Sequence, residues 1–88
     1  MTYSIVARDA GTGQLGVAVQ SHFFGVGRLV TWAEAGVGAV VTQSIPDVMH
    51  GIDGLAALRD GQDAEAVARS FVTDEPITAM RQFAVVDA

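Results

Sequence analysis

The residue in this sequence that could most clearly take part in a reaction is Thr2, directly behind the initiator methionine. Removal of Met1 would leave a free N-terminal threonine, whose α-amino group, with an ordinary pKa of about 7.7–8.0, lies a few bonds from the hydroxyl. Such an amine serves as the general base that turns a threonine hydroxyl into a nucleophile. The alternative is an ordinary strand residue, because threonine is a good strand former. The residues alone leave both interpretations open.

Other polar residues stand at the ends of predicted strands. Ser21 and His22 are adjacent, so on a strand their side chains point to opposite faces and cannot pair as nucleophile and base. Gln43 and Ser44 follow a buried strand, where either a binding site or a turn is expected. Arg28 can bind a carboxylate or raise the local potential, or can simply be a solvated loop charge.

The composition narrows the classes of function. Half of the 88 residues are hydrophobic and 17% are charged, which indicates a folded chain. The lack of cysteine excludes disulfides and thiolate zinc sites, and two histidines far apart predict neither a metal site nor another cofactor. A net charge of −5 without any lysine argues against nucleic acid or an anionic membrane as partner. With no visible secretory signal or membrane-spanning run, we expect a cytoplasmic protein.

Patterns of hydrophobicity predict the strands that position these residues. Alternation over 2–9, a turn at 10–13 and a second run over 14–21 predict an antiparallel hairpin. The second arm is apolar over 15–19, which predicts burial on both of its faces. A glycine-containing loop follows over 22–28. Three more strands are predicted over residues 29–36, 37–44 and 80–88, and the second of these is again apolar on both faces.

Two helices are predicted between the fourth and fifth strands. Apolar residues recur at helical spacing after Pro46, at Val48, Ile52, Leu55 and Ala56. Gly61 is expected to end this helix and Asp63 to cap the next one. His50 and Asp53 are expected on the solvent side of the first helix. The order of four strands, two helices and a strand indicates a layered α+β fold rather than alternating βαβ units.

Two features of the sequence suggest that further polypeptide covers part of the apolar surface of this chain. The final "FAVVDA" echoes "SIVARDA" of the first hairpin, but the chain stops where a second hairpin would turn back, leaving an exposed edge. We therefore expect a partial domain. Phe23, Phe24 and Trp32 lie near loops and are expected in the core or an interface, so we also expect a homo-oligomer.

The segments "TYSIVARD", "GQLGVAVQS", "AGVGAVVTQ", "GLAALRDGQDAEAV" and "RQFAVVDA" together resemble the N-terminal part of the domain-of-unknown-function 1028 family. The resemblance covers essentially the whole chain and implies one domain over 1–88. Family members are similar to Ntn hydrolases, which implies a four-layer αββα sandwich with an N-terminal nucleophile. The family itself has no established activity.

The resemblance also implies roles for individual residues. Thr2 matches the nucleophile position of an amidohydrolase, acting on a small amide or peptide-like substrate. Arg28 falls near a lysine that perturbs the nucleophile in proteasome-type enzymes, and its fixed charge permits only an electrostatic role. The backbone amides of Gln43 and Ser44 correspond to the oxyanion hole.

Two positions depart from the hydrolase pattern. Ser21, or its neighbour Gln20, stands where proteasome-type enzymes have an acidic residue, and His22 stands where many family members have lysine. These departures favour an alternative: a catalytically inert αββα domain used for binding or assembly.

Overall fold

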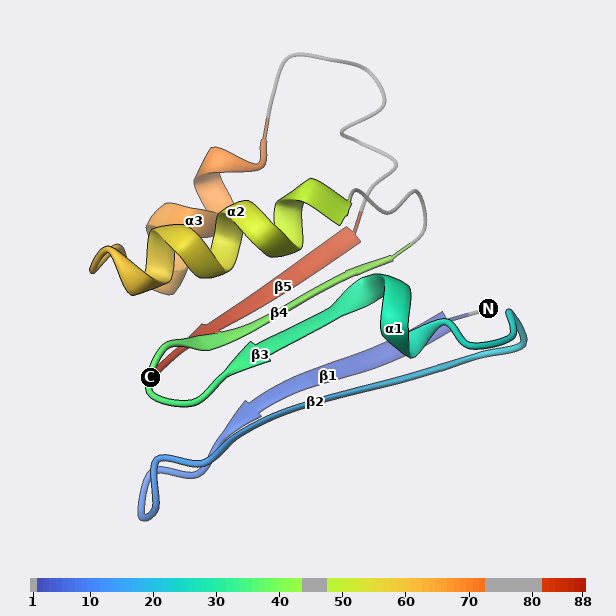
Figure 1. The fold of residues 1–88 in the computed structure, drawn as a ribbon, viewed down its shortest axis with the longest axis horizontal. Helices are drawn as coiled ribbons and strands as arrows, with labels where there is room; N and C mark the ends of the chain where they lie inside the picture. Colours follow the sequence, from blue (N-terminus) through green and yellow to red (C-terminus); the bar gives the residue numbers. More distant parts are fainter. Residues whose placement is uncertain (1, 44–47, 73–81) are drawn as a thin grey trace.

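In the computed structural model, residues 2–43, 48–72 and 82–88 are described, and they form a helix layer, a sheet and a second sheet (Figure 1). The strands are β1 (Thr2–Arg8), β2 (Leu15–Ser21), β3 (Thr31–Glu34), β4 (Gly38–Gln43) and β5 (Gln82–Asp87). The helices are α1 (Gly27–Val30), α2 (Val48–Arg59) and α3 (Ala64–Ser70). The predicted α+β class and order of elements are confirmed, with α1 as an addition.

Strands β1 and β2 form the antiparallel hairpin that the alternation predicts. Its turn is closed by Asp9, whose Oδ1 accepts hydrogen bonds from the backbone N–H groups of Gly11 at 2.8 Å and Thr12 at 3.2 Å. At the other end of the hairpin, Thr2 lies directly opposite Ser21. The pairing register therefore brings together two of the candidate site residues, Thr2 and Ser21.

The second sheet is antiparallel, with β4 between β3 and β5. Residues 38–42 of β4 are all buried, which confirms that this strand is covered on both faces. Because side chains alternate along a strand, Val40 contacts the helix layer while Val41 faces the hairpin. Strand β4 thus separates the helical core from the space between the two sheets, called here the inter-sheet space.

Helices α2 and α3 cover the side of this sheet away from the hairpin (Figure 1). Their core cluster consists of Val40, Leu58, Val67 and Phe71. The predicted cap of α3 is confirmed, because Asp63 Oδ1 accepts from the N–H of Ala66 at 2.8 Å. Gly61 has φ +100° just past the end of α2, as expected for the residue after a helix C-terminus.

Trp32 is a core residue, which was one of the two expected places for it. Its ring packs against the backbone of α2 at Gly51, where a Cβ atom would lie 1.9 Å from Trp32 Cδ2. Only glycine allows this close approach of α2 to β3. The position of α2 over the sheet therefore depends on one residue without a side chain.

The predicted third strand is partly wrong, because Leu29 and Val30 belong to the short helix α1. The hydroxyl of Thr31 donates to the carbonyl oxygen of Gly27, which closes the helical turn before β3 begins. The turn buries Val30 to 3% exposure, whereas Leu29 remains exposed. Local hydrogen bonding and burial of one valine thus override the strand pattern.

The expected solvent position of His50 is also wrong, whereas Asp53 is exposed as expected. The imidazole of His50 is half-buried and stacks on Phe71, with ring centroids 4.2 Å apart and an interplanar angle of 7°. Phe83 completes this group at right angles to Phe71. A flat amphipathic ring fits against aromatic neighbours, so histidine extends the apolar face of α2.

The outer face of the hairpin contradicts the expectation that β2 is buried on both sides. Burial alternates along β2, and on β1 the outward Tyr3 and Ile5 are 61% and 60% exposed. Within the described residues no helix lies over this face (Figure 1). The described chain therefore has the helix–sheet–sheet part of a layered sandwich.

Candidate active site

The candidate site lies where β1 begins, at the Thr2 end of the inter-sheet space. Thr2, Ser4 and Val6 are half-buried and alternate with exposed residues, so they share the inner face of β1. Toward the N-terminus the lining of this space thus changes from valine to hydroxyl side chains. The half-buried hydroxyl groups of Thr2 and Ser4 both need hydrogen-bond partners.

Thr2 finds its partner on the neighbouring strand. Its hydroxyl donates to Ser21 Oγ at 3.1 Å, and the backbone N–H of Phe23 donates to the same oxygen at 3.2 Å. Hydroxyl hydrogens rotate, so Ser21 is equally able to donate to Thr2 Oγ1 while still accepting from Phe23. The Thr2 hydroxyl is therefore oriented by a residue that can accept or supply a proton in the hydrogen bond.

The Gln43 side chain links β1 to the second sheet. Its Oε1 accepts from Ser4 Oγ at 2.9 Å. Its Nε2 donates to the carbonyl oxygen of Thr2 at 3.2 Å and to Gln82 Oε1 at 2.7 Å. One carboxamide thereby connects three strands, β1, β4 and β5.

A small cavity of about 110 Å³ lies against this cluster. Its lining residues are Ser4, Val41, Gln43, Gln82, Phe83 and Ala84. The polar groups facing it are a hydroxyl and two carboxamides. This chemistry suits a small, uncharged group that both donates and accepts hydrogen bonds.

Comparison with known proteins places the chain in a family. The sequence matches the family model described as "Family of unknown function (DUF1028)" over residues 2–88. The chain belongs to the DUF1028 family. A comparison with curated proteins gives no match.

A solved DUF1028 structure shows the same fold. The chain is similar to the crystal structure of protein SPO2555 from Silicibacter pomeroyi, a structure of the same family, with a TM-score of 0.87 and 31% sequence identity. The alignment covers 98% of this chain and 40% of that one. This DUF1028 chain therefore spans 40% of the length of the solved relative.

The structure brings some of the predicted site residues together and leaves others apart. Thr2, Ser21 and Gln43 belong to one hydrogen-bonded cluster. His22 is exposed at the bend after β2 and Arg28 is exposed on α1. Across the described part of the chain, neither side chain makes a hydrogen bond or ion pair. The predicted Ser44 lies outside the described residues.

Sequence reasoning missed two members of the cluster, Ser4 and Gln82. The signal for Ser4 was present, because strand alternation puts it on the same face as Thr2. Gln82 carried no such signal, since its place beside Gln43 follows from the pairing of β4 with β5, across 39 residues of sequence.

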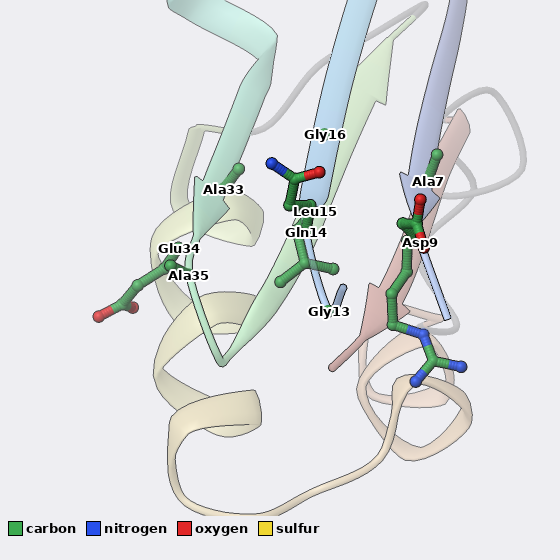
Figure 2. Close-up of a pocket in the computed structure, with 10 residues that line it drawn as sticks. Ala7, Asp9, Gly13, Gln14, Leu15, Gly16, Ala33, Glu34 and Ala35 are labelled. Atoms are coloured by element: carbon green, nitrogen blue, oxygen red, sulfur yellow. The ribbon is translucent and has the colours of Figure 1, made fainter. Parts of the chain in front are cut away.

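A larger cleft of about 790 Å³ lies at the opposite end, called here the turn end, between the hairpin turn and the β3–β4 turn (Figure 2). Leu15 and Gly16 of β2 line it on one side and Ala33 of β3 on another. The Glu34 carboxylate points away from Leu15 in Figure 2 and accepts a hydrogen bond from Arg59 Nε at 3.4 Å. This hydrogen bond, with the attraction between the charges, raises the pKa of Arg59.

The described residues contain neither a metal-binding cluster nor a membrane-spanning helix. Among residues 2–43, 48–72 and 82–88, no three acidic or histidine side chains lie close enough to hold a metal ion. No helix in this part of the DUF1028 chain combines the length and apolarity needed to cross a membrane.

Proposed function

We propose that this DUF1028 chain is an amide hydrolase whose nucleophile is the hydroxyl of Thr2, freed at the N-terminus by removal of Met1. The supporting observation is the hydrogen bond of 3.1 Å between Thr2 Oγ1 and Ser21 Oγ, beside a cavity lined by neutral polar groups. A nucleophile needs a fixed position and a nearby pocket for the reacting group. Ser21 holds the Thr2 hydroxyl, and the cavity is lined by Ser4, on the same face of β1, and by Gln43, which bonds to the carbonyl oxygen of Thr2.

In the proposed reaction the α-amino group of Thr2 takes the hydroxyl proton as Oγ1 attacks the carbonyl carbon of an amide. The tetrahedral intermediate collapses by breaking the C–N bond, and the α-ammonium returns the proton to the leaving amine. The acyl group is then held as an ester on Thr2. Water attacks this ester, giving its proton to the amine, and releases the carboxylic acid and the free hydroxyl.

Neighbouring residues take supporting roles in this proposal. Ser21 orients the nucleophile and can donate to Oγ1 as the hydroxyl proton leaves. Backbone amides of Gln43 and Ser44 receive the oxyanion, as the family resemblance implies. Exposed Arg28 adds only a screened positive potential, and exposed His22 contacts the part of the substrate outside the cavity.

The cavity restricts the substrate class in this proposal. A volume of about 110 Å³ accommodates a group of a few non-hydrogen atoms. Neutral hydroxyl and carboxamide groups can hydrogen-bond to an uncharged polar acyl group, whereas a carboxylate buried in the cavity would lack a countercharge. We therefore expect small amides or peptides with a short, neutral side chain at the cleaved bond.

The test is hydrolysis of a panel of small amides by protein with its native start, whose intact mass reports whether Met1 is absent. We expect Thr2→Ala to lose activity by at least about 1,000-fold. Thr2→Ser keeps a nucleophile and retains measurable activity. Thr12→Ala, an exposed threonine of the hairpin turn, is the matched control and stays at the wild-type rate. Full activity in Thr2→Ala, or in protein that retains Met1, would contradict the proposal.

A second candidate function is a catalytically inert binding or assembly domain that forms homo-oligomers. It is favoured by the exposed apolar surface at Tyr3 and Ile5, and by Phe24, which is 98% exposed. Light scattering across a concentration series tests it. Self-association that is lost on Ile5→Thr, with no hydrolysis by the wild type, supports this candidate, and a monomer at all concentrations contradicts it.

A further inference from the structure

We propose that the Gln43 side chain is the positioning residue of the site: it ties the first residue of β1 to the second sheet and so fixes Thr2. Its consequence for catalysis rests on the proposed function, whereas its structural role does not. Gln43 was expected to contribute a backbone amide. The contacts assign a separate role to its side chain.

The first argument is the need for a tether at this position. Terminal residues fray unless other groups hold them, and within the described residues β1 is paired along a single edge, with β2. A nucleophile at the start of β1 would share that mobility. The bond from Gln43 Nε2 to the carbonyl oxygen of Thr2, at 3.2 Å, holds the backbone of the nucleophile itself.

The second argument is the completeness of the carboxamide's bonding. Both of its N–H hydrogens are used, on Thr2 and on Gln82, and its oxygen accepts from Ser4 at 2.9 Å. Partners on both ends fix which end of the carboxamide carries the nitrogen. A side chain with no remaining hydrogen to donate is suited to holding Thr2 rather than to stabilising a new charge.

The third argument is that the residue types most similar to glutamine in shape or size do not meet these demands. Glutamate has the same shape but only acceptor oxygens, so it would face the carbonyl oxygen of Thr2 without a hydrogen to donate. Asparagine is one methylene shorter and does not span the two sheets in the same way. Leucine fills the volume but leaves the Ser4 hydroxyl without its partner.

The experiment compares Gln43→Glu with Gln62→Glu, the same change at an exposed position between α2 and α3. Amide hydrogen exchange at Tyr3 and Ser4, the first two amides after a free Thr2, reports the tether directly. Labelling of the N-terminal threonine with an electrophile reports positioning of the nucleophile. We expect Gln43→Glu to exchange at least about tenfold faster at these two amides and to label at least about tenfold more slowly. Gln62→Glu matches the wild type in both.

The pH dependence of Tm adds a readout that a general loss of packing would not give. The carboxylate introduced at position 43 meets acceptor oxygens in the folded state, so its pKa rises above the ordinary value of about 4.3. The variant is then destabilised above that range, by roughly 8 °C in Tm, and recovers as the pH falls and the carboxyl group regains a hydrogen to donate.

The outcomes separate the two proposals. Wild-type exchange at Tyr3 and Ser4 in Gln43→Glu overturns the positioning role, whatever the labelling shows. Fast exchange in Gln43→Glu together with an unreactive Thr2 in the wild type supports the tether and contradicts the hydrolase. Fast exchange with slowed labelling supports both.

Discussion

The two ends of the inter-sheet space differ in what their polar residues do. At the turn end, three carboxylates maintain the fold: Asp9 closes the hairpin, Glu34 pairs with Arg59, and Asp87 accepts from the N–H of Ala64 at 2.8 Å. At the Thr2 end the polar groups are neutral and converge on one another across two sheets.

Cavity size and hydrogen-bonding groups favour opposite ends of the inter-sheet space. The larger cleft, about 790 Å³, lies at the turn end, where Asp9 and Glu34 are already engaged in the fold. The cavity at the Thr2 end is about 110 Å³ but is lined by polar side chains that bond to one another through Gln43, which also bonds to the carbonyl oxygen of Thr2. The hydrogen-bonding groups that line a cavity are a better guide to a site than its volume is. A cleft between two turns can be large without holding groups that bind a ligand.

The largest effect on stability is expected from a change in the helix layer, which packs on the sheet that both ends share. Gly51→Ala places a Cβ 1.9 Å from Trp32 Cδ2, so α2 must move off the sheet. Overpacking costs about 3 kcal/mol and outweighs the gain of up to ~1 kcal/mol in helix propensity. Denaturant unfolding should show a net loss of about 2 kcal/mol. Gly16→Ala, with nothing within 4 Å, is the control and should change stability by less than about 0.5 kcal/mol.

An effect of intermediate size is expected from a change at the turn end that leaves the Thr2 end unaffected. Asp9→Ala removes the acceptor for the N–H groups of Gly11 and Thr12 in the hairpin turn. We expect a loss of about 1 kcal/mol in the free energy of unfolding, because these exposed groups regain water. The Thr2 labelling rate should stay at the wild-type value. A drop in that rate would show that the ends are coupled and would weaken the distinction drawn between them.

The smallest effect is expected at the ion pair of the turn end. Glu34→Gln removes the charge that faces Arg59 on an exposed surface. Exposed pairs contribute little and are screened by salt, so we expect Tm to fall by less than about 2 °C at low salt and to be unchanged at high salt. A large, salt-independent fall would mean that Glu34 has a further role in the cleft.

Sequence patterns predicted local structure well where one signal dominated. The alternation over 2–9, the turn at 10–13 and the second run over 14–21 predicted the hairpin, and Asp63 and Gly61 marked helix ends that the structure confirms. The helix α1 was missed because its four residues carry too short a pattern to outweigh neighbouring β-branched residues. His50 was misplaced because its ring joins an aromatic group that forms only in three dimensions.

The candidate site could be predicted only in part. Thr2 and Ser21 were singled out by residue type and strand position, and the hairpin register then placed them opposite each other. The contact between Ser4 and Gln43 spans 39 residues of sequence and depends on how one sheet lies over the other. Alternation assigns faces within a strand but not which faces meet, so this link required the structure.

The central claim is that Thr2 is a nucleophile, and one measurement tests it most directly. Protein with its native start is first weighed intact, then treated with an electrophile selective for N-terminal threonine, and the adduct is mapped by peptide mass spectrometry. The account predicts that Met1 is absent and that Thr2 is modified far faster than the new N-terminus of Thr2→Ala. Retained Met1, or equal rates in the two proteins, would contradict it and leave the hairpin as part of a binding domain.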